Sequence, residues 1–252
     1  MPVLSKVTKK YLLDFCFRLS VFLFVAAVYV LAPQQLEFTR NAFTVPLVIL
    51  WIAVIFSMLI QLNPKSALTT GCLKQFPSRH DPVAVYDAEK LQKAVREQNV
   101  GAVKVAAVWV IVNALFWALY HMGRMRSRTL ILLCALCYLC DLVCVLFFCP
   151  FQFFLMHNRC CVNCRIFAWG SWMMAAPLMG VPHLYSWSLA GAGIVVLAVW
   201  EWRYRRHPER FWFGSNRNLQ CAHCAEKLCR YKVPHNNMYG NPAFRLREKE
   251  SV

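Results

Sequence analysis

Several common functional motifs are missing from this chain. It contains no Gly-rich phosphate loop, no Gly-x-Ser-x-Gly nucleophile elbow and no His-Glu-x-x-His zinc motif. Their absence argues against nucleotide-driven transport and against the common hydrolases, although an enzyme built from dispersed residues still fits the sequence. No Cys-x-x-Cys-His attachment motif occurs either, which argues against haem. The sequence shows no internal repeat and no low-complexity segment.

Acidic residues are scarce, with 12 Asp and Glu against 28 Lys and Arg. A formal charge of +16 would suggest nucleic acid as the partner of a soluble protein. However, 59% of the 252 residues are hydrophobic and the mean hydropathy is +0.41, which is too much apolar surface for a soluble core of this size. We therefore expect an all-α integral membrane protein of the cell or an inner membrane. Its basic residues would contact an anionic inner leaflet, and no nucleic-acid partner is expected.

Six apolar stretches are candidates for membrane spans, because a hydrocarbon core of ~30 Å needs about 20 apolar residues in a helix. They are residues 11–32, 43–62, 103–122, 129–150, 166–182 and 185–202. The fifth stretch is marginal in length and is interrupted by glycine and proline, so a re-entrant segment is the alternative there. The sequence thus predicts a bundle of about six transmembrane helices with a small cytoplasmic cysteine knuckle.

Lys and Arg are unequally distributed between the two sides of this predicted bundle. With the N-terminus inside, 23 of them are cytoplasmic, four are outside and Arg18 is within a span. The positive-inside rule then predicts that both termini are cytoplasmic. The basic and aromatic segment 201–213 is typical of a headgroup anchor, and Glu201 within it is expected to be solvated.

Four regions follow from this topology. They are a two-helix membrane hairpin (1–62), a cytoplasmic loop (63–102), a four-helix membrane region (103–202) and a basic cytoplasmic tail with the second cysteine pair (203–252). Within the loop, Asp81-Pro82 predicts the start of an amphipathic helix. Ala88, Leu91 and Val95 would share its apolar face, which we expect to lie on the membrane or on the bundle.

Two Cys-x-x-Cys pairs form the clearest candidate site. Cys161 and Cys164 precede the fifth stretch, and Cys221 and Cys224 follow the sixth, so the two intervening crossings bring both pairs to one face. In a reducing cytoplasm, paired thiols are better explained as metal ligands than as disulfides. Two such knuckles supply the four thiolates of a tetrahedral site. Basic neighbours, Arg165 among them, are expected to lower the thiol pKa values and so favour metal binding.

The spacing leaves the identity of the metal open. Zn²⁺ as a structural clamp is the first expectation, and iron or an iron–sulfur cluster for electron transfer fits the same pattern. A membrane thiol–disulfide oxidoreductase is a further alternative. Additional ligands could come from Cys160, Cys229, His157 and His223. The pairs resemble the knuckles of zinc ribbons and rubredoxins as a type of site, without indicating membership of either family.

Asp141 is the second candidate, because a carboxylate at membrane depth is costly and marks a functional site by default. Its possible partners are Asn113 and His121 on the third stretch and Arg18 on the first. Asp14 lies four residues before Arg18, where the two side chains can pair. A small ion or solute transporter that uses Asp141 and Asp14 is therefore an alternative function. A buried structural network is the simpler explanation of the same residues.

Four more cysteines, Cys134, Cys137, Cys140 and Cys144, lie on one face of the fourth stretch. A relay of thiols could carry metal or electrons, but cysteine is also a small hydrophobic residue that packs well between helices. We expect packing. Nothing in the sequence identifies a protein partner.

Overall fold

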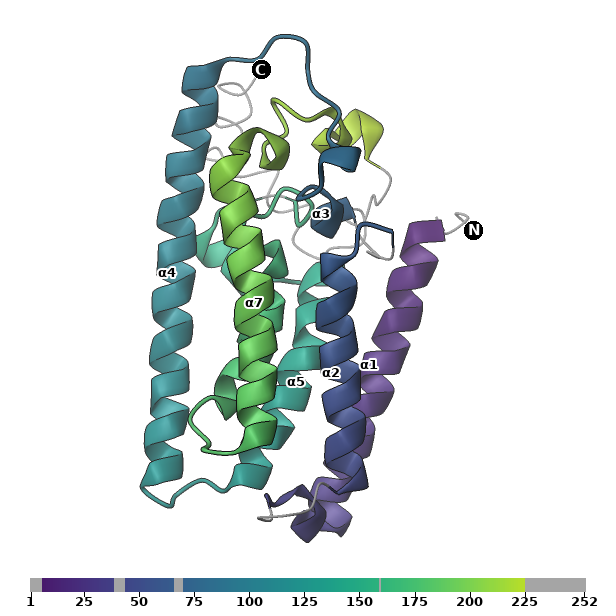
Figure 1. Cartoon of the computed structure of the whole chain (residues 1–252), viewed down its shortest axis with the longest axis vertical. Coiled ribbons are helices and arrows are strands. Elements are labelled where there is room, and N and C mark those ends of the chain that lie inside the picture. Colours follow the sequence, from purple (N-terminus) through teal and green to yellow (C-terminus); the bar gives the residue numbers. More distant parts are fainter. Residues whose placement is uncertain (1–5, 39–43, 66–69, 159, 225–252) are drawn as a thin grey trace.

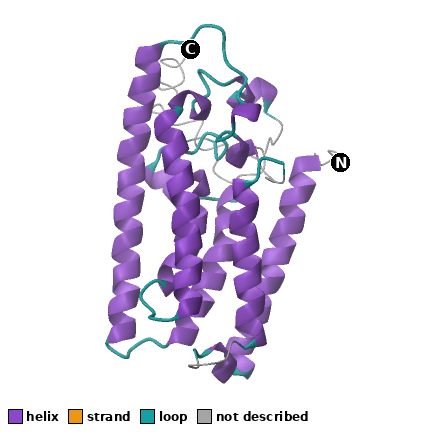
Figure 2. Cartoon of the chain, in the orientation of Figure 1, coloured by secondary structure: helices purple, strands orange, loops and turns teal. Residues whose placement is uncertain are grey.

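The computed structural model describes residues 6–38, 44–65, 70–158 and 160–224, and within these ranges the chain forms helices and no β-strand (Figures 1 and 2). Five of the helices are long and apolar enough to cross a membrane. They are α1 (Lys6–Leu31), α2 (Val45–Leu62), α4 (Ala88–His121), α5 (Ser127–Leu146) and α7 (Leu184–Arg206). The predicted all-α fold is confirmed, and the described residues contain five candidate membrane spans in place of the six that were predicted.

Large apolar side chains cover the outer faces of the long helices. Leu13 of α1, Ile52 of α2 and Ile111 of α4 are more than half exposed. Soluble proteins rarely expose apolar surface continuously along several helices. In a bilayer the same surface contacts lipid, while each helix satisfies its own backbone hydrogen bonds. The exposed faces therefore favour an integral membrane protein.

Short elements connect the long helices. They are η1 (Pro33–Leu36), α3 (Thr70–Leu73), η2 (Pro77–Arg79), the π-helical turn η3 (Phe151–Leu155), η4 (Phe167–Trp169), α6 (Gly170–Ala175), η5 (Ala176–Leu178), η6 (Pro208–Phe211), η7 (Arg217–Leu219) and η8 (Cys221–His223). Most of them gather where α1 begins and α7 ends (Figure 1), which we call the cap end. The opposite end, where α1 ends and α7 begins, is the turn end.

Residues 166–182 form the three short elements η4, α6 and η5 instead of a sixth long helix. The segment starts at the cap end, where Trp169 Nε1 donates to Glu201 near the end of α7. Just beyond its other limit, His183 stacks on Phe38 at the turn end, with ring centroids 4.5 Å apart. The segment therefore runs from one end of the bundle to the other. Pro177 lacks the N–H that a continuous helix needs, which explains the interruption.

Helix α4 joins the predicted amphipathic helix and the third span into a single helix of 34 residues. Asp87 is its N-cap, and its carboxylate accepts from two backbone N–H groups of the first turn at 2.8 and 3.2 Å. The predicted start at Asp81-Pro82 is therefore wrong. At the other end, Gly123 adopts a φ of +71°, a conformation that favours glycine after a helix. At about 51 Å, α4 is longer than the hydrocarbon core.

Candidate functional site

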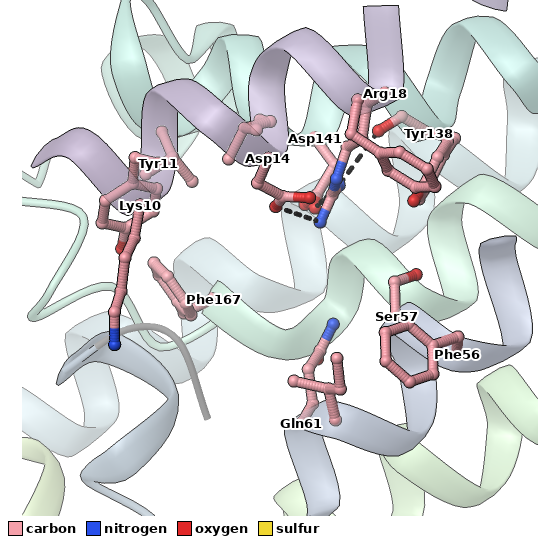
Figure 3. A pocket seen from close by; sticks show the side chains of 14 residues that line it. Lys10, Tyr11, Asp14, Arg18, Phe56, Ser57, Gln61, Tyr138, Asp141 and Phe167 are labelled. Atoms are coloured by element: carbon pink, nitrogen blue, oxygen red, sulfur yellow. Dashed lines mark hydrogen bonds and ion pairs between the residues drawn. The ribbon is translucent and has the colours of Figure 1, made fainter. Parts of the chain in front are cut away.

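A buried arginine joins two carboxylates between α1 and α5 (Figure 3). Arg18 Nη2 lies 3.2 Å from Asp14 Oδ2, and Arg18 Nη1 lies 2.8 Å from Asp141 Oδ2. Nη1 also donates to the backbone carbonyl of Tyr138 at 3.0 Å, and the guanidinium lies 4.6 Å from the centroid of the Tyr138 ring. The Arg18 side chain is 7% exposed. We call Asp14, Arg18 and Asp141 the charged triad.

Helix geometry explains how these residues meet. Asp14 and Arg18 are four residues apart on α1, and Tyr138 and Asp141 are three apart on α5, so each pair shares one helix face. Gly170 at the start of α6 makes room for the Asp141 carboxylate, because a Cβ at position 170 would collide with Asp141 Oδ1. The triad thus requires three elements that are distant in sequence.

A cavity of about 140 Å³ opens beside the triad, between α1, α2, α5 and Phe167. Two buried polar atoms on its lining residues, Arg18 Nε and Gln61 Oε1, have no hydrogen-bond partner among the described residues. Buried polar groups are nearly always paired, so such atoms beside a cavity favour a water or a small polar ligand there. Lys10 also lines the cavity, but Figure 3 shows its amine directed away from Asp14.

The predicted pairing of Asp14 with Arg18 is confirmed, and of the three predicted partners of Asp141, Arg18 is the one in contact. Asn113 is buried but donates to the carbonyl of Trp109 in its own helix. His121 is in the last turn of α4 and stacks edge-on against Tyr120. The sequence could not choose among these partners, because the choice depends on α1 packing directly against α5.

Both predicted cysteine pairs form tight turns at the cap end. Cys164 N donates to Cys161 O at 3.0 Å, and Cys224 N donates to Cys221 O at 3.4 Å. Cys161 is half-buried, Cys164 is buried, Cys221 is exposed and Cys224 is half-buried. In the part of the chain that the structure describes, no three His, Cys, Asp or Glu side chains are placed to hold a metal ion together.

The additional candidate ligands do not complete the site either. His157 is exposed and has a φ of +48°. His223 is exposed and lines a separate cavity with Lys74, and Cys229 lies outside the described residues. The four-thiol metal site stays a prediction.

Cys161 contacts the end of α5 and η3, which the sequence did not predict. Its thiol donates to Gln152 Oε1 at 2.9 Å and lies 3.8 Å from the carbonyl oxygen of Cys144. Gln152 N in turn donates to the thiol of Cys149 at 3.4 Å. Of the predicted stripe, Cys134 is fully buried in the main apolar core, as expected for packing, whereas Cys137 and Cys144 are half-buried and Cys140 is exposed.

Burial controls the thiol chemistry of residues 160–164. It raises the pKa of Cys164 to about 12, and the neighbouring Cys161 acts in the same direction. Burial likewise raises the pKa of Cys160 to about 12, with smaller contributions that include Cys161 and Cys224. A nearby cation, Lys74, does lower the pKa of Cys164, but the larger cost of burying a thiolate outweighs this effect and the net pKa is raised.

Lys74 holds the cysteine loop in place. Its side chain is buried, and Nζ donates to the carbonyls of Val162 and Cys164, at 2.7 Å in both cases. The ammonium also lies 5.4 Å from the Trp200 ring centroid and 5.6 Å from that of Phe211, distances typical of cation–π contacts. No sequence signal marked Lys74, because a lysine in a predicted cytoplasmic loop is ordinary.

Arg165 forms a second buried connection between the cysteine loop and α7. Its guanidinium makes a bidentate pair with Glu201, at 2.6 Å for both bonds, and Nε donates to Asn99 Oδ1 at 2.9 Å. Trp200 Nε1 donates to the Arg165 carbonyl at 2.8 Å. The prediction that Glu201 is solvated is wrong, because the interrupted segment brings Arg165 against it. We call Lys74, Arg165 and Glu201 the clamp.

Comparison with known proteins gives no relative. No protein-family model, no curated protein sequence and no solved structure matches this chain. The class is defined by the molecule itself: a helical protein with five helices suited to cross a membrane, a charged triad beside a cavity within them, and a clamped cysteine loop at the cap end.

Proposed function

We propose that this protein is a small membrane transporter that moves a proton or another small monovalent cation through the cavity at the charged triad. The observation that supports it is the ratio of charges: two carboxylates contact one buried guanidinium. With both carboxylates ionised, the triad has a formal charge of −1 at membrane depth. Such a charge is unfavourable in an apolar environment, so a bound proton or cation stabilises it.

The roles of the three residues follow from their contacts. Arg18 contacts both carboxylates, and its single positive charge balances only one of them. The other carboxylate gains and loses the transported cation. Asp141 is on α5 and Asp14 is on α1. When the cation binds one carboxylate, the Arg18 guanidinium shifts towards the other, so cation binding in the cavity is coupled to the packing of the two helices. The unpartnered Gln61 Oε1 is an acceptor for a water or cation on the way.

Flux measurements on reconstituted protein test this function. Vesicles containing the purified protein and a trapped pH-sensitive dye are given a proton gradient, and Na⁺ and K⁺ gradients are tested in parallel. We expect Asp141→Asn to abolish flux and Asp141→Glu to retain part of it. Glu37→Gln is the matched control, because Glu37 is paired with exposed Arg126 at the turn end. Equal flux in folded Asp141→Asn and unaltered protein would reject the transporter.

A second candidate function is metal binding at the two cysteine pairs, with Zn²⁺ as a structural clamp or with iron or an iron–sulfur cluster for electron transfer. The observation in its favour is that both Cys-x-x-Cys turns lie at the cap end, where Cys224 is close enough to influence the pKa of Cys160. Cys161, Cys164, Cys221 and Cys224 would be the ligands, and the metal would draw the two turns together.

Metal analysis of anaerobically purified protein tests the second candidate. A colourless protein with one bound zinc ion would indicate a structural zinc site, whereas a coloured protein with iron would indicate electron transfer. Protein without metal whose Cys161 and Cys164 are trapped as a disulfide in cells would instead favour a thiol–disulfide oxidoreductase. Metal-free protein with permanently reduced thiols would contradict all three.

We also propose that the cap end faces the cytoplasm, with both termini there. Basic residues are concentrated in the segments of the cap end, and the last turn of α7 carries Arg203, Arg205 and Arg206. Trp202 is 59% exposed and Arg206 lies 5.6 Å from its ring centroid. Basic and aromatic side chains at a helix end favour contact with the headgroups of an anionic inner leaflet.

A further inference from the structure

Two loops that are far apart in sequence are fastened together at the cap end. Pro82 and Asn216 form an antiparallel bridge, in which Val83 N donates to Ser215 O at 3.0 Å and Arg217 N donates to Asp81 O at 2.8 Å. Asn218 Nδ2 also donates to the carbonyl of Arg79 at 2.9 Å. The backbone around Arg79 is therefore held against the segment that leads to Cys221.

A cavity of about 130 Å³ lies at this junction, and its lining is basic. Lys74, Arg79 and His223 contribute side chains to it, together with Asn216, Asn218 and two leucines, and no acidic residue lines it. Asn216 uses its amide to hold the loops, since Nδ2 donates to Arg210 O and Oδ1 accepts from Asp81 N and Asn218 N. The lining is thus a rigid frame that carries positive charge.

The Arg79 guanidinium and the His223 imidazole face the cavity and are available to a ligand. Neither the Arg79 guanidinium nor the His223 imidazole has an ion pair or a side-chain hydrogen bond with any described residue. The nearby carboxylate of Glu209 is bonded to His207 Nδ1 at 3.1 Å and does not line the cavity. Besides Arg79, Lys74 contributes a second cation at the inner wall, where its position is fixed by the carbonyls of Val162 and Cys164.

We propose that this cavity binds a phosphate group. Arg79 presents the planar set of N–H donors that pairs with two phosphate oxygens, and His223 and Asn218 supply further donors around the same space. The walls are fixed by backbone bonds between the loops, so little ordering is needed on binding. A phosphate has the charge and the several acceptor oxygens that this lining matches. It can come from a lipid headgroup or from a free phosphate compound.

The test uses the full-length protein in a phosphate-free maltoside detergent. In one arm, inorganic phosphate is titrated and its binding is measured by calorimetry at low ionic strength. In the other arm, the protein is mixed with micelles containing phosphatidylglycerol, and the retained lipid is counted by native mass spectrometry. We expect Arg79→Gln and His223→Gln each to weaken binding about tenfold in whichever arm, inorganic phosphate or phosphatidylglycerol, shows binding to the unaltered protein.

Arg217→Gln is the matched control. Arg217 is exposed on the same segment but does not line the cavity. Its substitution by Gln removes the same charge as Arg79→Gln. Binding of inorganic phosphate supports a free phosphate compound as the ligand, and retention of phosphatidylglycerol alone supports a headgroup. Equal losses in Arg217→Gln and Arg79→Gln would indicate general attraction to a basic surface and overturn the proposal. Absence of binding in both arms would also overturn it.

Discussion

At the scale of single residues, the charged triad depends on space as much as on charge. Asp141 reaches Arg18 only because residue 170 has no side chain. Asp141 is short and is held by the Arg18 guanidinium, so it cannot move aside without losing the ion pair. The glycine at the start of α6 is therefore part of the site, although it has no chemical group of its own.

Substitution of Gly170 tests this dependence. We expect Gly170→Ala to destabilise the protein by about 1–3 kcal/mol, as overpacking of a buried site does, and to reduce cation flux because Asp141 is displaced. Gly191→Ala is the matched control, since a Cβ at position 191 in α7 meets open space and alanine favours the helix by about 0.5–1 kcal/mol. Thermal unfolding in detergent measures both. A melting temperature in Gly170→Ala equal to that of Gly191→Ala would contradict the packing argument.

At the scale of elements, the lengths of the apolar runs predicted the positions of most long helices. The sequence did not predict features that depend on contacts between elements. Periodicity and hydropathy located α1, α2, α5 and α7 well, because each is a nearly continuous apolar run. The same signals divided α4 in two, since its polar first half and apolar second half look like different elements. The buried roles of Lys74, Arg165 and Glu201 could not be predicted, because they depend on how the interrupted segment 166–182 packs against α7.

Burial of Cys164 predicts low thiol reactivity in the cysteine loop. A pKa of about 12 for Cys164, against 9.0 for an ordinary thiol, lowers its thiolate fraction at pH 8 about a thousandfold. We therefore expect iodoacetamide to modify exposed Cys221 long before Cys164, as followed by mass spectrometry. Because the folded state keeps Cys164 protonated, its contribution to stability is complete below pH 9 and is lost as the pH rises towards about 12.

Breaking the clamp should expose this thiol. Glu201→Gln leaves the buried Arg165 guanidinium without its ionic partner, which favours local opening of the loop. We expect Cys164 to be alkylated at least about tenfold faster in this variant. Glu209→Gln, which removes a carboxylate from a partly exposed pair with His207, should leave the rate unchanged. Equal rates in Glu201→Gln and the unaltered protein would mean that Arg165 does not hold the loop.

At the scale of the whole molecule, the number of crossings decides whether the two cysteine pairs share a side. The interrupted segment runs from the cap end to the turn end and α7 returns, so residues 161–164 and 221–224 lie at the same end of the bundle (Figure 1). The sequence identified this segment as the uncertain one from its glycines and prolines. It could not show that three short helical elements, packed against α5 and α7, connect the two ends of the bundle.

Thiol labelling from one side of the membrane tests this arrangement. We expect Cys221 and a cysteine introduced at exposed Ser78 to be protected together from a membrane-impermeant reagent in intact cells, and to react together after lysis. A cysteine introduced at exposed Arg124, at the turn end, should show the opposite pattern. Reaction of positions 78 and 124 from the same side would contradict the topology. Reaction of Cys221 and position 78 in intact cells, with position 124 reacting only after lysis, would reverse the proposed orientation.

The contacts of Lys74 also set an order for the assembly of the chain. Its ammonium bonds to carbonyls 88 and 90 residues later and faces the rings of Trp200 and Phe211. During synthesis, none of these groups exists when Lys74 leaves the ribosome, so the lysine has none of these partners until the chain that follows it has been made. The cap end can close only after residue 211 has emerged. Burial of the Lys74 charge is therefore a late event, which follows the synthesis of α7 and η6.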